Sequence, residues 1–164
     1  MTFQVRRIQP SDANAIVDIL KETGLFHHLD SEPLEATRAR VRRHLNLCLA
    51  NDSHSVYVAQ SASGEIAGYA AAHWIPNLFL PGPEGYVSEL FIRAPARGQG
   101  IGTCLLEEIE QEAKRRGCAR LSLINLRQRE SYQRGFYRAR GWEERPEAAN
   151  FVYRFPEEST NGKE

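Results

Sequence analysis

The stretch Arg97-Gly98-Gln99-Gly100-Ile101-Gly102-Thr103 is the most informative part of this chain. Three glycines within five positions remove side chains from the backbone at the point where a helix is expected to begin. The N–H groups of a first helical turn have no partner inside the helix, and the helix dipole places positive potential behind them. Such a turn suits an anionic ligand, above all a phosphate. We therefore expect a phosphate-binding turn here.

A strand and a helix flank this turn. The apolar run Tyr86–Ile92 precedes it and predicts a strand. Apolar residues then recur every four positions from Ile101 to Ala113, which predicts an amphipathic helix over Gly100–Arg116. The expected local order is therefore strand, glycine-rich turn and helix.

Two common phosphate-binding turns do not match. A dinucleotide turn has the pattern G-x-G-x-x-G, but Thr103 follows Gly98-Gln99-Gly100-Ile101-Gly102. A P-loop requires a lysine after its glycines, and none follows Gly102. A nucleotide-binding module is therefore a distant alternative.

The remaining elements mix hairpins with helical crossovers. Hydrophobic periodicity predicts further helices over 10–23, 34–48 and 130–140, with a loop over 25–31. Further strands are predicted over Phe3–Ile8, Ser55–Gln60, Glu65–Ile75, Ala119–Asn125, Trp142–Arg145 and Asn150–Phe155. The resulting order, β-α-α-β-β-β-α-β-α-β-β, indicates an α/β (α+β) protein with a mixed sheet flanked by helices.

Length and composition predict one domain. A chain of 164 residues with 41% hydrophobic residues can bury a single core, which we place over residues 1–155. The polar stretch 156–164 is expected to be a disordered tail.

Charge, hydropathy and cysteine content exclude several classes of function. The formal net charge of +0 gives no bulk attraction to nucleic acid or to anionic membranes. No apolar run reaches the roughly 20 residues of a membrane span, and the N-terminus lacks a signal-peptide core. The odd set Cys48, Cys104 and Cys118 indicates reduced thiols in a cytoplasmic protein. No histidine has a metal-ligand spacing, so we expect no metal site.

Positive charge is concentrated in one region. Between Lys114 and Arg140 there are nine basic residues and one acid, Glu130. Pairs such as Glu112 and Arg116 at i,i+4 make surface ion pairs the simpler explanation for any one arginine. Collectively, the excess favours a polyanionic ligand near the glycine-rich turn.

Three features together resemble the GCN5-related N-acetyltransferase (GNAT) superfamily. Arg97, Gly100 and Gly102 form its R-x-x-G-x-G pattern, and Phe136-Tyr137-Arg138-Ala139-Arg140-Gly141-Trp142 is similar to its second signature. Asn125 stands where the family usually has an asparagine, at the end of the preceding strand. The resemblance covers nearly the whole chain. It implies a mostly antiparallel central sheet of six to seven strands flanked by about four helices.

The resemblance implies acetyl-CoA as the co-substrate. Amides of the glycine-rich turn would bind the pyrophosphate, with Arg97 adding charge. The strand before the turn would splay from its neighbour, so that its backbone pairs with the pantetheine arm while Asn125 reaches the pantetheine amides. That strand could equally be plain core, and both interpretations can hold together. The residues so assigned are Leu90, Phe91, Ile92, Arg97, Gly98, Gln99, Gly100, Ile101, Gly102, Thr103 and Asn125.

The resemblance also implies candidates for catalysis. Glu89 is the candidate general base that takes a proton from the amine, with substrate or solvent binding as the alternative. Tyr137 is the candidate general acid that protonates the leaving thiolate, with packing beside the cofactor as the alternative. Transfer would be direct, within a ternary complex. An alternative without catalysis is a silent acetyl-CoA sensor or interaction module. The presence of both Glu89 and Tyr137 argues against it, because binding alone needs neither residue.

The acceptor would be a small-molecule or peptide amine. In the family it enters opposite the cofactor, which here corresponds to the loops Gly24–Pro33 and Ile75–Gly85. Their apolar residues equally suit loop packing or a homodimer contact. Polyamines, amino acids, aminoglycoside-like compounds and protein N-termini all stay open as acceptors.

Overall fold

A computed structural model describes residues 2–155. These residues form two compact units, 2–124 and 125–155, which are described separately. The predicted disordered tail, 156–164, lies outside the described residues, and a single domain over 1–155 stays a prediction. No helix among the described residues is both long and apolar enough to cross a membrane.

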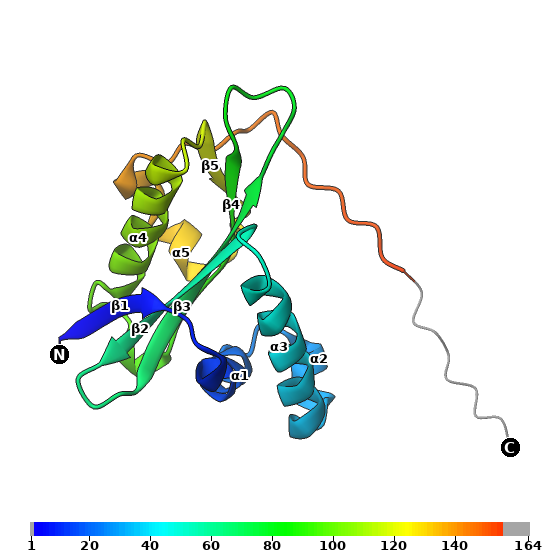
Figure 1. Cartoon of the computed structure of the whole chain (residues 1–164), viewed down its shortest axis with the longest axis vertical. Coiled ribbons are helices and arrows are strands. Elements are labelled where there is room, and N and C mark those ends of the chain that lie inside the picture. The colour runs from blue at the N-terminus through cyan, green and yellow to red at the C-terminus, as the bar shows by residue number, and fades with distance from the viewer. Residues whose placement is uncertain (1, 156–164) are drawn as a thin grey trace, which may run out of the picture. The chain divides into compact units, whose positions relative to one another are not determined.

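The first unit is built on a five-stranded sheet in the order β1-β2-β3-β4-β5 (Figure 1). Neighbouring strands are antiparallel except β4 and β5, which are parallel. The strands are β1 (Phe3–Arg7), β2 (His54–Ser61), β3 (Ile66–Ile75), β4 (Glu84–Ile92) and β5 (Arg120–Leu123). The helices are α1 (Ala13–Glu22), α2 (His27–Ser31), α3 (Leu34–Leu49) and α4 (Ile101–Arg115), with single 3-10 turns at Pro10–Asp12 and Ala94–Ala96.

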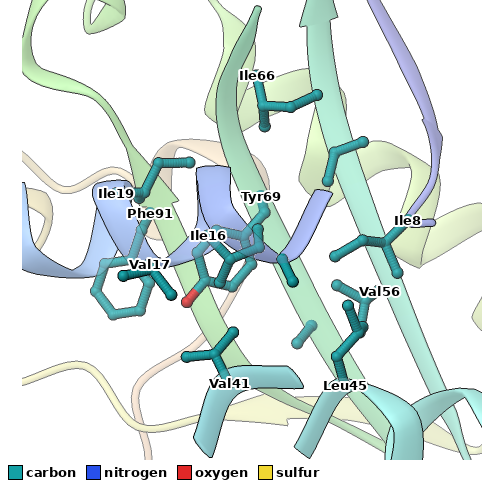
Figure 2. Close-up of a cluster of buried hydrophobic side chains, with 13 residues drawn as sticks. Ile8, Ile16, Val17, Ile19, Val41, Leu45, Val56, Ile66, Tyr69 and Phe91 are labelled. Atoms are coloured by element: carbon teal, nitrogen blue, oxygen red, sulfur yellow. The ribbon is translucent and has the colours of Figure 1, made fainter. Parts of the chain in front are cut away.

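Helices cover both faces of the sheet. On one face, apolar side chains of α1 and α3 pack against β2, β3 and the end of β4 (Figure 2). Val17 and Ile19 of α1 are almost fully buried there. On the other face α4 buries Leu105 and Ile109 on its inner side, as its four-residue periodicity predicts. The alternation of side chains along each strand supplies both layers.

The second unit differs from its prediction. The expected helix over 130–140 is interrupted at Gly135, whose φ of +65° is left-handed and ends the helical path. In place of the expected helix, the structure has the short helix α5 (Glu130–Gln133) and a 3-10 turn at Arg138–Arg140.

The strands predicted at Trp142–Arg145 and Asn150–Phe155 are wrong, since residues 142–155 are irregular. A strand needs a hydrogen-bonding partner, and side chains such as Phe151 remain 91% exposed. The sheet therefore has five strands among the described residues instead of six to seven. The loop predicted over 25–31 instead contains α2.

A buried carboxylate joins α4 to the sheet. Glu112 of α4 is only 4% exposed and accepts hydrogen bonds from the Tyr57 hydroxyl and from Nε of Arg116, the latter at 2.9 Å. Arg7 of β1 forms an ion pair with the same carboxylate. Burial alone would raise the pKa of Glu112, but the hydrogen bonds from Tyr57 and Arg116 outweigh burial and hold the pKa below its ordinary 4.5.

Removing this carboxylate should destabilise the protein. Glu112→Gln removes the charge-assisted contacts with Arg7 and Arg116, which typically costs about 2 kcal/mol of unfolding free energy. Because the folded pKa is depressed, the wild-type contribution is present above pH 4.5 and is lost as pH falls through the folded value. Urea unfolding at pH 7 and at acid pH measures both effects. Glu107→Gln, on the exposed side of α4, is the control. Equal urea midpoints for the two variants at pH 7 would contradict this role of Glu112.

Candidate active site

The pairing between β4 and β5 covers only part of β4. It runs from Glu84 opposite Arg120 to Val87 opposite Leu123, where β5 ends. From Ser88 onward β4 continues beside β3, with its register extending to Ile92 opposite Gly68. The pairing with β5 therefore covers only the first half of β4, up to Val87.

A β-bulge lies at the same position. Ala72 of β3 is opposite Val87, but Ala71 is opposite Glu89, so Ser88 is an extra residue in β4. A bulge bends its strand and changes the face to which the following side chains point. The bulge therefore separates the half of β4 that pairs with β5 from the half that leads to the glycine-rich turn.

The glycine-rich turn has the backbone that its sequence predicts. Gly98 and Gly100 have φ angles of +75° and +81°, which are strained for residues with a side chain. A Cβ atom at either position would meet nothing within 4 Å, so packing does not explain these glycines. Gly100 is the N-cap of α4, and its carbonyl accepts the first helical hydrogen bond, from Cys104 at 3.1 Å. Residues 97–100 of the turn are exposed, and the space beside Gly98 and Gly100 is open.

Two side chains of the loop brace it from within. Nε of Arg97 donates to the Ile92 carbonyl at 3.2 Å, and Nε2 of Gln99 donates to the Pro95 carbonyl at 3.1 Å. Ile101, 3% exposed, anchors the start of α4 in the core. The turn is held in shape by its own residues while residues 97–100 stay exposed.

Glu89 has a partner that the sequence did not reveal. The hydroxyl of Tyr69, on the neighbouring strand β3, donates a hydrogen bond to Oε2 of Glu89. Tyr69 is 2% exposed, and burial together with the charge of Glu89 raises its pKa well above 10. The phenol therefore stays protonated and holds the carboxylate in one orientation. No spacing rule relates residues 69 and 89, so only the strand register could identify this pair.

The surroundings of Glu89 are mostly apolar. The Phe26 ring meets the Phe91 ring edge-on, with centroids 5.8 Å apart, and Phe91 lies at the same distance from Tyr69. Cys48 of α3 is close enough for the charge of Glu89 to raise its thiol pKa, after the larger effect of burial. A carboxylate beside such a wall can hold an ammonium group or accept a proton.

The loop at residues 24–33 extends to this region, because Phe26 contacts Phe91. The other proposed acceptor loop, 75–85, lies at the start of β4. Glu84 and Glu89 are five residues apart, or about 16 Å along a strand. In that loop Leu78 is fully exposed and Phe79 is 75% exposed.

The second unit contains the other two candidate residues. Oδ1 of Asn125 accepts a hydrogen bond from the Ser131 hydroxyl at 3.1 Å, which ties Asn125 to the start of α5. Tyr137 packs edge-on against Phe136 and lies 5.8 Å from the Trp142 ring. Burial raises the pKa of the Tyr137 phenol, although Arg129 and Arg140 oppose the shift. Tyr137 is therefore a protonated hydroxyl at neutral pH.

The basic region is more neutral than its sequence suggests. Carboxylates form ion pairs with at least five of its basic residues: Arg115 with Glu108, Arg116 with Asp52 and Glu112, Arg120 with Glu84, and Arg127 and Arg138 with Glu144. All of these acids lie outside the stretch from Lys114 to Arg140, so a count within that stretch could not reveal them. Within residues 2–155, no group of three His, Cys, Asp or Glu side chains is arranged to hold a metal ion.

Comparison with known proteins identifies a family and several relatives. The sequence model of the acetyltransferase (GNAT) family matches residues 14–142. Acetyltransferase Atu2258 of Agrobacterium fabrum is 36% identical over 77 residues, which are 47% of this chain and 44% of that protein. Glucosamine 6-phosphate N-acetyltransferase 1 of rice, Oryza sativa subsp. japonica, is 29% identical over 104 residues, 62% of each chain. The alignments thus span less than two thirds of these relatives.

Solved structures share the fold. A protein described as a transcriptional regulator of Bacillus halodurans superposes with a TM-score of 0.82 at 22% identity, covering 94% of this chain and 100% of its own. Glucosamine-6-phosphate N-acetyltransferase of Arabidopsis thaliana gives a TM-score of 0.75 at 19% identity, covering 95% of this chain and 100% of its own. At these identities the likeness concerns the fold.

The closeness of Glu89 to Cys48 can be tested through thiol reactivity. Glu89→Gln removes a negative charge that raises the Cys48 pKa, so a larger thiolate fraction should make Cys48 react faster with a disulfide reagent at pH 8. Cys118 is the internal control, because burial, Arg116 and Glu112 determine its pKa. Peptide mapping after timed labelling gives both rates. An unchanged ratio of Cys48 to Cys118 labelling would contradict the arrangement.

Proposed function

Since this chain belongs to the acetyltransferase (GNAT) family, we propose that it transfers an acetyl group from acetyl-CoA directly to a primary amine. The observation that carries this proposal is the position of Glu89. Its carboxylate, oriented by the buried Tyr69 hydroxyl, stands where β4 has left β5 and leads toward the glycine-rich turn. A candidate base and a candidate cofactor site therefore lie on one short segment of chain.

Acetyl-CoA binding is assigned to two parts of this segment. The backbone amides from Gly98 to Thr103 would donate to the pyrophosphate oxygens, supported by the dipole of α4. The backbone of Leu90, Phe91 and Ile92 would pair with the pantetheine amides like an added strand. Because the Phe91 side chain is in the core, the contribution expected from it is its backbone. Asn125 would contribute its amide group to the pantetheine arm.

The amine must lose a proton before it attacks the thioester. An alkyl amine has a pKa near 10.4, so deprotonation at pH 7 costs about 4–5 kcal/mol. Glu89 would accept this proton, directly or through one water molecule. The apolar wall formed by Phe26 and Phe91 would also disfavour the charged amine. The nitrogen then forms a bond to the acetyl carbon.

The leaving thiolate needs a proton when the C–S bond breaks. Tyr137 would donate it, since its raised pKa keeps the phenol protonated at neutral pH. No covalent acetyl-enzyme is needed in this scheme. Cys104 lies in the first turns of α4 and Cys118 follows its end, and neither is assigned a role as nucleophile.

The acceptor is a small-molecule or peptide amine, and a sugar amine is one candidate because of the relative from rice. We place the protein in the cytoplasm, in line with its odd and widely spaced cysteines. A homodimer contact at the loops 24–33 and 75–85 stays the alternative to acceptor binding there. The direct experiment measures thiol release from acetyl-CoA with a panel of glucosamine 6-phosphate, amino acids, polyamines, an aminoglycoside and peptides. Amine-dependent thiol release supports the proposal. Tight CoA binding with no turnover for any amine would instead indicate a silent sensor.

The base and the acid should be separable by kinetics. Glu89→Gln removes the proton acceptor and Tyr137→Phe removes the proton donor, and each should lower kcat by about 100-fold or more. Raising the pH should partly restore Glu89→Gln, because more of the amine is then neutral in solution. Cys104→Ala is the matched control and should retain activity. Isolation of an acetylated enzyme on the catalytic path would contradict direct transfer.

The turn should be required for cofactor binding. Ala at position 100 must adopt a left-handed φ and places a methyl group where the phosphate would approach, so Gly100→Ala should weaken CoA at least about tenfold. Gly117→Ala, at the other end of α4 with φ +65° and open space around it, carries the same backbone strain and is the control. Calorimetric titration with CoA gives both affinities. Equal affinities in the two variants would exclude this turn as the cofactor site.

A further inference from the structure

We propose that His73 and Ser88 are positioning residues that hold the β-bulge of β4 and thereby direct Glu89 toward the face of the sheet that α1 and α3 cover. The structural part of this proposal, that the two side chains hold the bulge, does not depend on the proposed function. Its importance for catalysis rests on the proposed function of Glu89.

Side-chain alternation shows why the bulge matters. In a regular strand successive side chains point to opposite faces, so Ser88 and Glu89 would face opposite sides. Here both face the side covered by α1 and α3. Ser88 contacts His73, and Glu89 contacts Tyr69, which belongs to the core on that side.

The extra residue changes the face of everything that follows it. Without it, the alternation from Tyr86 would turn Glu89 toward α4 and bring Leu90 beside Tyr69. With it, Glu89 and Phe91 share a face, and Phe91 lies 5.8 Å from Tyr69. The position of the candidate base therefore depends on the bulge staying at Ser88.

Two hydrogen-bonding contacts from β3 hold this extra residue. Nε2 of His73 lies 2.9 Å from the Ser88 hydroxyl oxygen, and that hydroxyl lies 3.5 Å from the Ala71 carbonyl. His73 stands opposite Tyr86 and Ala71 stands opposite Glu89, so the contacts bracket the bulge. Both contacts connect the bulged residue Ser88 to β3, the strand that pairs with β4 on both sides of the bulge.

His73 is itself held in place. The His54 ring, directly opposite on β2, meets the His73 ring edge-on at 4.4 Å, and the Tyr86 ring lies 6.3 Å away on the other side. Nδ1 of His54 is 2.7 Å from the Ser53 hydroxyl. Burial, with a smaller effect of His54, lowers the pKa of His73, which favours the neutral ring as the partner of Ser88. This row of side chains limits the movement of His73 across three strands.

The first test is kinetic and uses the full chain. Ser88→Ala and His73→Ala should each lower kcat by about fivefold, as expected for the loss of one hydrogen bond, with a smaller change in the KM for acetyl-CoA. His73→Gln, whose amide can contact Ser88, should restore most of kcat. His54→Ala removes the ring packing that limits His73 but leaves the Ser88 contact, so its loss of kcat should be smaller than that of His73→Ala. An equal loss in His54→Ala would overturn the proposal.

A double-mutant cycle tests whether Ser88 acts through Glu89. In the Glu89→Gln background, Ser88→Ala should have no further effect on kcat. A full additional loss there would mean that Ser88 acts elsewhere, and the proposal would fail.

An NMR measurement tests, without an activity assay, whether His73 and Ser88 position Glu89 beside Tyr69. The nuclear Overhauser effect between the Tyr69 ring and the Glu89 side chain should weaken in Ser88→Ala and in His73→Ala, and should persist in His73→Gln and His54→Ala. Persistence in all four variants would overturn the proposal. If Glu89→Gln retains full kcat, the base assignment is wrong, and this measurement still decides whether the bulge positions Glu89.

Discussion

The early end of the pairing between β4 and β5 is the constraint on which the candidate site depends. A parallel pair that stayed in register along its length would cover both edges of β4 with backbone hydrogen bonds. Here β5 stops at Leu123, opposite Val87. The chain leaves β4 at Ile92, and α4 begins at Ile101 after the turn. The glycine-rich turn follows the part of β4 beyond β5. The cofactor binding that we propose for these backbone groups would therefore be a consequence of topology.

Charge is used differently on the two faces of the sheet. On the α4 side, Glu112 is buried and surrounded by donors from three elements, which makes it part of the folded framework. On the α1 and α3 side, Glu89 is only partly buried and receives a donor from Tyr69. A buried, fully partnered carboxylate stabilises structure, whereas a partly exposed one with a fixed orientation is suited to chemistry. The two glutamates thus have different surroundings, which supports the chemical role that we propose for Glu89.

Regular elements followed from the sequence where periodicity was long and strong. The helix starting near Ile101 and the hairpin of β2 and β3 are close to their predicted bounds. The prediction failed where a single residue or a missing partner decided the outcome. Gly135 adopts a left-handed φ and interrupts the expected helix. The segment 150–155 has strand-like residues, yet a strand forms only against a second strand.

The sequence by itself determined the family resemblance, the glycine-rich turn and the candidate residues Glu89 and Tyr137, because these depend on local spacing and on residue chemistry. Tertiary structure alone decided which side chains meet. The Tyr69–Glu89 hydrogen bond, the ion pairs of the basic region and the bulge at Ser88 join residues far apart in the chain or shift a register by one position. Such relations arise when strands align, and an alternating pattern cannot reveal a one-residue insertion that turns the following side chains to the other face.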